Sequence, residues 1–179
     1  RDSRFLFIAR AGQLIHASYR SVARIEALTD TGKTALPKQD SRKRVVIGVI
    51  GHDIHAVANR VLAVVLEDAG FFVCNLRTNN TIGDFVDAVL EVEADAVLMS
   101  SLNGEGENWC SGFRARLAEE GFGDILLYIG GNLVVGEADE SVVANRFQSW
   151  GFDRVFYGAA DLNQVISLLQ EDLAHGVPA

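Results

Sequence analysis

Two kinds of apolar segment alternate along the chain after residue 44, and this alternation constrains the fold more than any other feature. Residues 45–50 form a β-branched apolar run, which is typical of a strand buried on both faces of a sheet. Residues 57–68 follow with apolar side chains at the spacing of one helix face. The pair predicts a buried strand and then a helix that packs on the sheet.

The same pair of patterns recurs four more times along the chain. Further strands are expected at residues 71–76, 94–100, 125–129 and 154–156, and further helices at residues 82–90, 107–120, 139–150 and 162–174. Five such units with short connections predict a parallel sheet with helices on both faces, because each crossover is right-handed. We therefore expect an α/β fold: a doubly wound, five-stranded parallel sheet of the flavodoxin-like type, with strand order 2-1-3-4-5. In that order ligands bind at the carboxyl ends of strands 1 and 3, so function is expected in loops 51–56 and 102–106.

Charge divides the chain near residue 44. Residues 1–44 carry a net charge of +6, and the rest of the chain carries a net charge of −14. We interpret residues 1–44 as a basic, flexible extension or linker, and residues 45–175 as the folded domain. An acidic domain repels phosphate backbones, so nucleic acid is not an expected partner.

Other features narrow the compartment and the chemistry. No apolar run approaches the roughly eighteen residues that span a bilayer, and no secretory leader is recognisable, so we expect no membrane partner and a cytoplasmic location. The two cysteines, Cys74 and Cys110, are interpreted as free thiols. We find no hydrolase motif G-x-S-x-G, no ligand set for a closed zinc site and no dinucleotide-binding G-x-G-x-x-G.

Asp53 and His55 stand two residues apart in the loop after the first expected strand. A carboxylate that accepts the Nδ1 hydrogen of His55 would fix its tautomer and leave Nε2 as an oriented lone pair, the usual arrangement behind a metal-bound histidine. The alternative is that Asp53 caps the following helix beside a solvated histidine, and spacing alone favours this alternative. His52, one residue nearer the strand, is interpreted as a surface loop residue.

Two further loops carry small and polar residues. In "SSLNGEGE", Ser100 and Ser101 end the third strand, where hydroxyls either bond a buried polar ligand group or form a helix-capping turn. In "YIGGNLVVG", Gly130 and Gly131 leave the fourth strand and allow a flat ligand to approach the backbone closely. Each signal is weak alone.

The spacing of the three loops is more specific. Residues 53–58, 100–102 and 130–131 resemble the D-x-H-x-x-G…S-x-L…G-G pattern of cobalamin-binding domains, with 41 and 27 residues between the three elements. In particular, the chain resembles the small, cobalamin-binding subunits of glutamate mutase, also called methylaspartate mutase. The segments that carry this likeness are "GVIGHDIHAVANRVL", "MSSLNGEGE", "GGNLVVG" and "RFQSWGFDRVF". The resemblance covers roughly residues 44–173.

The resemblance implies a base-off adenosylcobalamin, with His55 replacing dimethylbenzimidazole as the lower axial ligand of cobalt and Asp53 behind it. The displaced nucleotide tail would enter a slot beside the sheet. The cofactor-binding residues so implied are His52, Asp53, Ile54, His55, Ala56, Ala58, Ser100, Ser101, Leu102, Gly130, Gly131, Asn132, Leu133, Val134, Val135 and Gly136. Two positions depart from the family pattern. Ala58 replaces the glycine of the motif, so retained but weakened binding is expected, and Asn103 stands where close relatives carry an aromatic residue.

The resemblance also implies the reaction and the partner. A mutase of this type is an isomerase that converts L-glutamate to threo-3-methyl-L-aspartate by a radical route, and the cofactor carries the chemistry. The L-glutamate would bind to a large barrel subunit in a hetero-oligomer such as a heterotetramer, and only the complex would be active. Two alternatives stay open: a corrinoid carrier of a methyltransferase system, and a non-catalytic cobalamin-binding or receiver-like signalling module. A receiver needs an Asp at the end of strand 3 and a Lys after strand 5, whereas here that strand ends in serines and no Lys follows residue 44.

Overall fold

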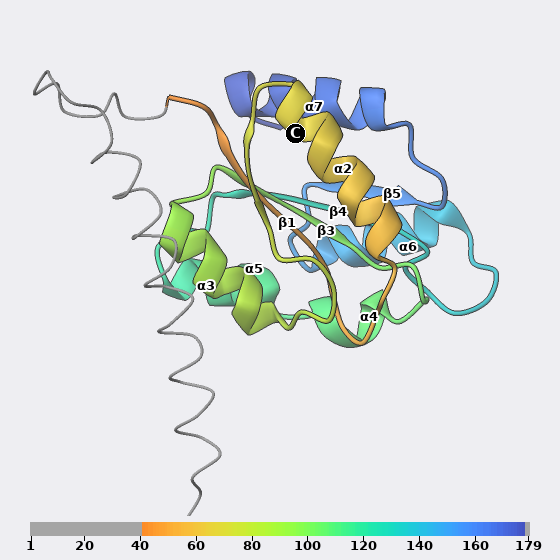
Figure 1. Ribbon diagram of the computed structural model, residues 1–179. Helices are drawn as coiled ribbons and strands as arrows, with labels where there is room; N and C mark the ends of the chain where they lie inside the picture. Colours follow the sequence, from red (N-terminus) through yellow and green to blue (C-terminus); the bar gives the residue numbers. More distant parts are fainter. Residues whose placement is uncertain (1–40, 178–179) are drawn as a thin grey trace, which may run out of the picture. The chain divides into compact units, whose positions relative to one another are not determined.

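The computed structural model describes residues 41–177, and a five-stranded parallel sheet lies at the centre of this part of the chain (Figure 1). The strands are β1 (Arg44–Val49), β2 (Phe72–Asn75), β3 (Ala96–Ser100), β4 (Leu126–Gly131) and β5 (Arg154–Tyr157). Their order is β2-β1-β3-β4-β5, so the predicted doubly wound, flavodoxin-like topology is confirmed. Every residue of β1 after Arg44 is buried, as its unbroken apolar run predicts.

Helices cover both faces of the sheet. They are α2 (Ala56–Asp68), α3 (Ile82–Val92), α4 (Gly106–Cys110), α5 (Phe113–Glu119), α6 (Glu140–Ser149) and α7 (Leu162–His175). One apolar cluster joins the sheet to α2 and α7, around Leu66 and Leu169. A second cluster joins the opposite face to α3, α5 and α6, around Phe85 and Phe147. Figure 1 shows the same division, with α2 and α7 on one side of the strands.

Three helices begin at side-chain caps. Thr81 caps α3, where it forms a reciprocal capping box with Asp84. Asp139 and Asp161 accept hydrogen bonds from backbone N–H groups in the first turns of α6 and α7. The N-cap of α2 is His55, and no side chain caps this helix. The alternative interpretation of the Asp-x-His pair, an aspartate that caps α2, is therefore wrong.

The prediction of a single helix at residues 107–120 is also wrong. The segment forms α4 and α5, separated by Ser111 in an extended conformation and by Gly112 at φ +83°. Glycine takes this left-handed conformation without the strain of a Cβ atom. Cys110 and Phe113 are both fully buried across the break, so their apolar spacing imitates that of a continuous helix. The other predicted elements match the observed ones to within two residues at each end.

Other expectations meet the structure only in part. Cys74 and Cys110 are free thiols, as predicted. Within residues 41–177, no helix is long and apolar enough to cross a membrane. Of the predicted extension, residues 1–44, the first forty residues lie outside the described part of the chain.

Candidate functional site

The loops that follow β1 and β3 are joined by one buried carboxylate, that of Asp53. Its Oδ2 atom accepts hydrogen bonds from the backbone N–H groups of Leu102 at 2.6 Å and Asn103 at 3.1 Å. Its Oδ1 atom accepts the backbone N–H of His55 at 3.0 Å and lies 2.6 Å from the Nδ1 atom of the same residue. Asp53 therefore holds the two loops together at the point where the strand order reverses.

The protonation of this pair follows from its surroundings. Burial opposes the charged form of Asp53, but the hydrogen bonds from the Leu102 backbone and from the backbone and ring of His55 outweigh it and hold the pKa of Asp53 below its ordinary value. An ionised carboxylate only accepts hydrogen bonds, so Nδ1 of His55 carries the hydrogen of the contact. In the neutral ring the Nε2 atom then keeps its lone pair. The predicted contact between the carboxylate and Nδ1 is present.

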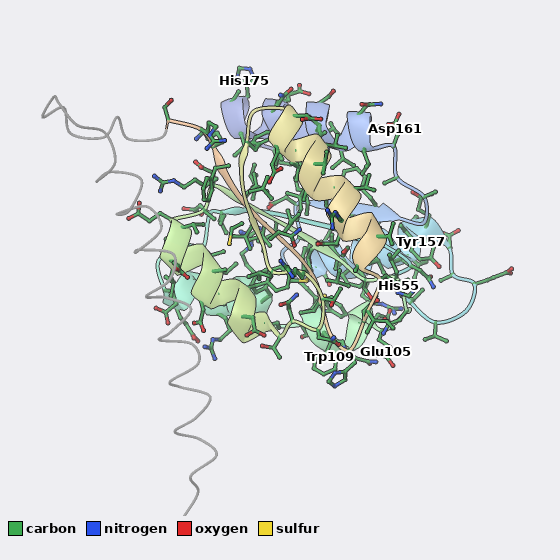
Figure 2. All side chains as sticks on the ribbon, in the orientation of Figure 1. His55, Glu105, Trp109, Tyr157, Asp161 and His175 are labelled. Atoms are coloured by element: carbon green, nitrogen blue, oxygen red, sulfur yellow. The ribbon has the colours of Figure 1, made fainter. Side chains whose placement is uncertain are left out.

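His55 is accessible from outside the domain. Its side chain is 55% exposed. Figure 2 places it at the amino end of α2, at the same end of the domain as Glu105 and Trp109. Within residues 41–177, no three His, Cys, Asp or Glu side chains converge as a metal site. The arrangement therefore offers one histidine nitrogen to a metal that brings its other ligands with it.

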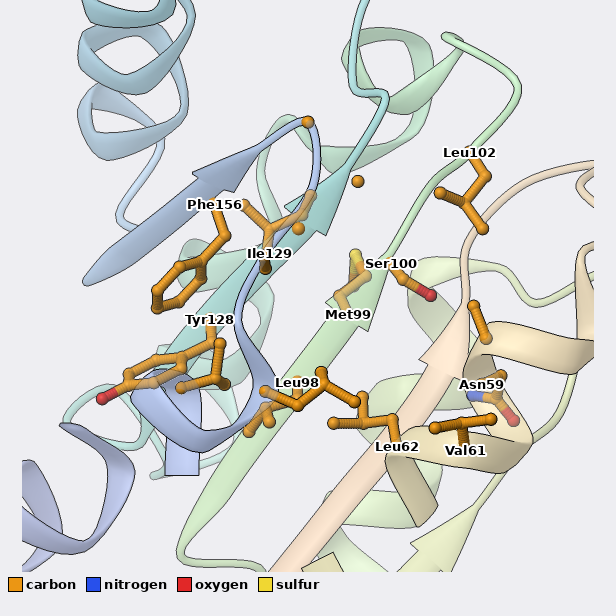
Figure 3. Close-up of a pocket in the computed structure, with 17 residues that line it drawn as sticks. Asn59, Val61, Leu62, Leu98, Met99, Ser100, Leu102, Tyr128, Ile129 and Phe156 are labelled. Carbon is orange, nitrogen blue, oxygen red and sulfur yellow. The ribbon is translucent and has the colours of Figure 1, made fainter. Parts of the chain in front are cut away.

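An apolar pocket lies beside this pair, between α2 and α7 and against β3 and β4 (Figure 3). Its volume is about 330 Å³, within the range of small-molecule sites. The lining residues are Ala58, Asn59, Val61, Leu62, Leu98, Met99, Ser100, Leu102, Tyr128, Ile129, Gly130, Gly131, Phe156, Gly158, Ala160, Leu162 and Val165. None of these side chains is charged, so the pocket suits an aromatic or apolar group.

Five of the predicted cofactor-binding residues line this pocket: Ala58, Ser100, Leu102, Gly130 and Gly131. The methyl group that replaces the motif glycine therefore stands at a pocket wall, in the first turn of α2. Ser100 donates a long hydrogen bond, 3.4 Å, to the Gly48 carbonyl. The lining of the pocket therefore includes at least one residue from each of the three segments that carry the predicted pattern.

The two glycines at the end of β4 have different structural requirements. Gly131 has φ +111°, and a Cβ atom there would lie 2.3 Å from the carbonyl oxygen of Ser101. A Cβ atom on Gly130 would only touch Phe156 at 3.4 Å. Gly131 is thus required by the close approach of the loop after β3, in addition to its place at the pocket wall.

Other predicted residues do not line the pocket. Leu133 and Val134, which were expected alongside the slot, are buried in the apolar cluster that contains α6, on the opposite face of the sheet. Ser101 is buried, and its hydroxyl donates to Asn103 Oδ1 at 3.2 Å. The remaining predicted residues are exposed and outside the lining: His52, Ile54, Ala56, Asn132, Val135 and Gly136.

Two loop residues make local contacts. The His52 ring lies edge-to-face on Trp109, with 5.0 Å between ring centroids. Asn103 accepts the backbone N–H of Glu105 at 3.0 Å and donates to the Glu105 carboxylate at 3.0 Å. These two hydrogen bonds join Asn103 to Glu105 within the loop that follows β3.

The sequence interpretation missed a polar network that begins at Tyr128 in the pocket wall. The Tyr128 hydroxyl donates to buried Asp172 at 2.5 Å, and Arg154 donates to both oxygens of the same carboxylate at 2.9 and 2.8 Å. Burial and then the carboxylate raise the pKa of Tyr128 well above its ordinary value. No sequence motif indicates this network, because its three residues come from β4, β5 and α7 and are far apart in the sequence.

Comparison with known proteins gives a family and a set of relatives. A family model described as the B12 binding domain matches residues 43–160. The glutamate mutase sigma subunit of Carboxydothermus hydrogenoformans is 48% identical over 129 residues, which cover 72% of this chain and 94% of the relative. The protein of the same name from Escherichia coli O157:H7 is 47% identical over 129 residues, 72% of this chain and 87% of the relative.

Solved structures show the same fold at low identity. A cobalamin-binding protein from Desulfitobacterium hafniense superposes with a TM-score of 0.59 at 22% identity, over 74% of this chain and 59% of its own length. The chain thus spans about three fifths of that protein. A signal receiver domain from Mycobacterium tuberculosis gives a TM-score of 0.54 at 12% identity, over 75% of this chain and 98% of the receiver. These likenesses concern the fold alone.

Proposed function

Because the chain belongs to the B12-binding domain family, we propose that it binds cobalamin as the small subunit of a glutamate mutase. The observation that carries the proposal is an exposed imidazole, His55, whose Nδ1 atom lies 2.6 Å from the buried Asp53 carboxylate, beside an apolar pocket. A metal-ligating histidine almost always has such a partner on its other ring nitrogen.

We infer that the cofactor is adenosylcobalamin and that Nε2 of His55 would bind its cobalt. When bound, the cofactor would supply the radical chemistry of a carbon-skeleton rearrangement. The chain's own part is to present Nε2 of His55 in one tautomer and one orientation. Asp53 does this because the N–H groups of Leu102 and Asn103 fix its carboxylate from the opposite side.

The chemistry of the pocket supports the proposal that the nucleotide tail of cobalamin binds there. A displaced benzimidazole is flat and mostly apolar, and the walls between α2 and α7 are mostly apolar, with the rings of Tyr128 and Phe156 among them. The glycines at the end of β4 keep the pocket free of side chains at that edge. Ala58 adds one methyl group to the α2 wall, which is expected to weaken binding without preventing it.

We propose that the substrate binds to a large barrel subunit. A dicarboxylic amino acid such as L-glutamate is recognised by cationic donors, and the lining of this pocket contains none. The word "subunit" in the names of the relatives supports an assembly of unlike chains. The complex would be an isomerase of the methylaspartate mutase type, located in the cytoplasm, with this chain as its cofactor-binding part.

Cobalt ligation by His55 can be tested with the purified chain. Protein labelled with 15N, mixed with unlabelled cobalamin and reduced to Co(II), should show coupling of the cobalt to one 15N nucleus by electron spin resonance, which distinguishes a protein imidazole from the base of the cofactor. His55→Ala should abolish this coupling, whereas His52→Ala, a matched change in the same loop, should retain it. Coupling that persists in His55→Ala would show that another group is the ligand.

The reaction requires a separate measurement. The chain combined with the large subunit of a glutamate mutase, adenosylcobalamin and L-glutamate should form 3-methylaspartate. Cobalamin binding with no mutase activity, together with methyl transfer from a methylated corrinoid, would instead favour the corrinoid carrier.

A further inference from the structure

The side chain of Asn103 closes the loop that follows β3. Its Oδ1 atom accepts hydrogen bonds from the backbone N–H of Glu105 at 3.0 Å and from the hydroxyl of Ser101 at 3.2 Å. Its Nδ2 atom donates to the Glu105 carboxylate at 3.0 Å. A bond from an asparagine oxygen to the N–H group two residues later forms an Asx turn, which fixes the backbone between the two residues. Ser101 is buried, so its hydroxyl adds a bond from the interior of the domain.

The backbone of this loop also holds Asp53. The N–H groups of Leu102 and Asn103 both donate to one atom, Oδ2 of Asp53, at 2.6 and 3.1 Å. Two consecutive N–H groups reach the same oxygen only when the loop keeps one conformation. The next residue, Gly104, has φ +81°, and glycine is the residue with the greatest conformational freedom to lose. The side-chain bonds of Asn103 restrict that freedom at the point where the carboxylate is bound.

A chain of contacts therefore leads from Asn103 to the imidazole. The Asn103 side chain fixes the loop, the loop fixes the Asp53 carboxylate, and the carboxylate lies 2.6 Å from Nδ1 of His55. Groups behind a metal-binding histidine set its tautomer and its orientation. We propose that Asn103 is a positioning residue, which acts through the loop and Asp53 to keep the His55 ring in one tautomer and one orientation. Its effect on cobalt binding rests on the proposed function, whereas its effect on the tautomer does not.

The test uses three variants. Asn103→Ala removes the three side-chain bonds and leaves the backbone N–H group in place. The double change Asn103→Asp with Glu105→Gln exchanges donor and acceptor between the two side chains, so it keeps all three bonds and serves as the conservative variant. Asp139→Ala is the matched control, because the Asp139 carboxylate also accepts the N–H group two residues later, that of Ser141 at 2.8 Å, but at the start of α6.

The first measurement is the tautomer of His55 in the protein without cofactor. It is read from the 15N chemical shifts of the ring at a pH where the ring is neutral, with His55→Ala to assign the signals. In the unchanged protein Nδ1 should have the shift of a protonated nitrogen and Nε2 that of a nitrogen with a lone pair. In Asn103→Ala the two shifts should move toward each other as the second tautomer becomes populated. The conservative variant and Asp139→Ala should keep the original shifts.

The second measurement is the affinity for cobinamide, by spectral titration. Cobinamide is a cobalt corrinoid without the lower base and nucleotide tail, so its binding reports the bond from His55 to cobalt with little contribution from the pocket. Asn103→Ala should weaken this binding about tenfold, the lower end of the range for groups behind a metal ligand, and the other two variants should stay within about twofold. Both alanine changes remove a local turn bond, so a difference between them separates positioning from a general loss of stability.

Two results would overturn the role of Asn103. Unchanged ring shifts of His55 in Asn103→Ala would mean that Asp53 is held without this side chain. Equal changes in Asn103→Ala and Asp139→Ala would point to a general loosening of the fold. Failure of the unchanged protein to bind either cobinamide or cobalamin would instead refute the proposed function, and the ring shifts would still decide the role of Asn103.

Discussion

Replacing Asp53 by asparagine should strongly destabilise the fold, apart from any effect on the cofactor. The carboxylate receives three backbone N–H groups and the Nδ1 contact of His55, and its side chain is out of contact with solvent. A carboxamide has one oxygen, so its NH₂ end would face N–H donors in place of an acceptor. If two hydrogen bonds to a charged group are lost at about 1.5 to 3 kcal/mol each, Asp53→Asn costs about 3 kcal/mol or more.

Chemical denaturation at neutral pH measures this loss, and Asp161→Asn provides the control. Asp161 caps α7 from an exposed position, where asparagine is an equally good cap, so its replacement should cost less than about 0.5 kcal/mol. Because the folded pKa of Asp53 is below its ordinary value, its contribution is complete above about pH 4 and is lost as the pH falls through the folded pKa. A cost of Asp53→Asn similar to that of Asp161→Asn would refute the reasoning.

Three further changes test other parts of the site. Gly131→Ala should destabilise the fold by about 2 kcal/mol or more in denaturant titrations, because its Cβ atom would meet the Ser101 carbonyl at 2.3 Å; Gly158→Ala, where φ is +83° but the space is open, should cost only about 1 kcal/mol, and equal costs would contradict the clash. Tyr128→Phe removes the donor to the buried carboxylate of α7 and should lower the free energy of unfolding by about 1 kcal/mol, whereas an unchanged value would mean that this hydrogen bond adds nothing. Burial raises the pKa of the Cys110 thiol to about 12, so iodoacetamide at pH 8 should leave it unmodified in the folded protein and alkylate it in denaturant; rapid labelling of the native state, detected by mass spectrometry, would show that this part of the core opens.

The fold could be predicted from the sequence because its signals are local and repeated. Each strand is a short apolar run and each helix an amphipathic run, and four right-handed crossovers leave few possible strand orders. The single helix predicted at residues 107–120 was wrong for a local reason. Gly112 breaks it in a left-handed conformation, while the buried residues on either side keep helical spacing, so periodicity outweighed the glycine.

The candidate site could be predicted only where the chain itself brings residues close. Asp53 and His55 are two residues apart, so their contact could be inferred from spacing. The bonds from Asp53 to the loop after β3 span 49 and 50 residues and depend on the register of two strands. Leu133 and Val134 show that neighbours in sequence can also separate in space. They follow the pocket-lining Gly131 by only two and three residues, yet their side chains are buried in the core on the other face of the sheet.

Under the proposed function, α2 would hold the metal ligand and part of the pocket wall on one rigid helix. His55 is its N-cap, and seven residues later Leu62 forms part of the pocket wall, about 10 Å further along the helix axis. A tail that enters the pocket and displaces α2 must displace the imidazole with it, and a metal bound to the imidazole restrains the wall. The binding free energies of the two events are therefore linked, and linkage of this kind is reciprocal. Ligation of the metal by His55 should therefore depend on whether the cofactor carries a tail that occupies the pocket.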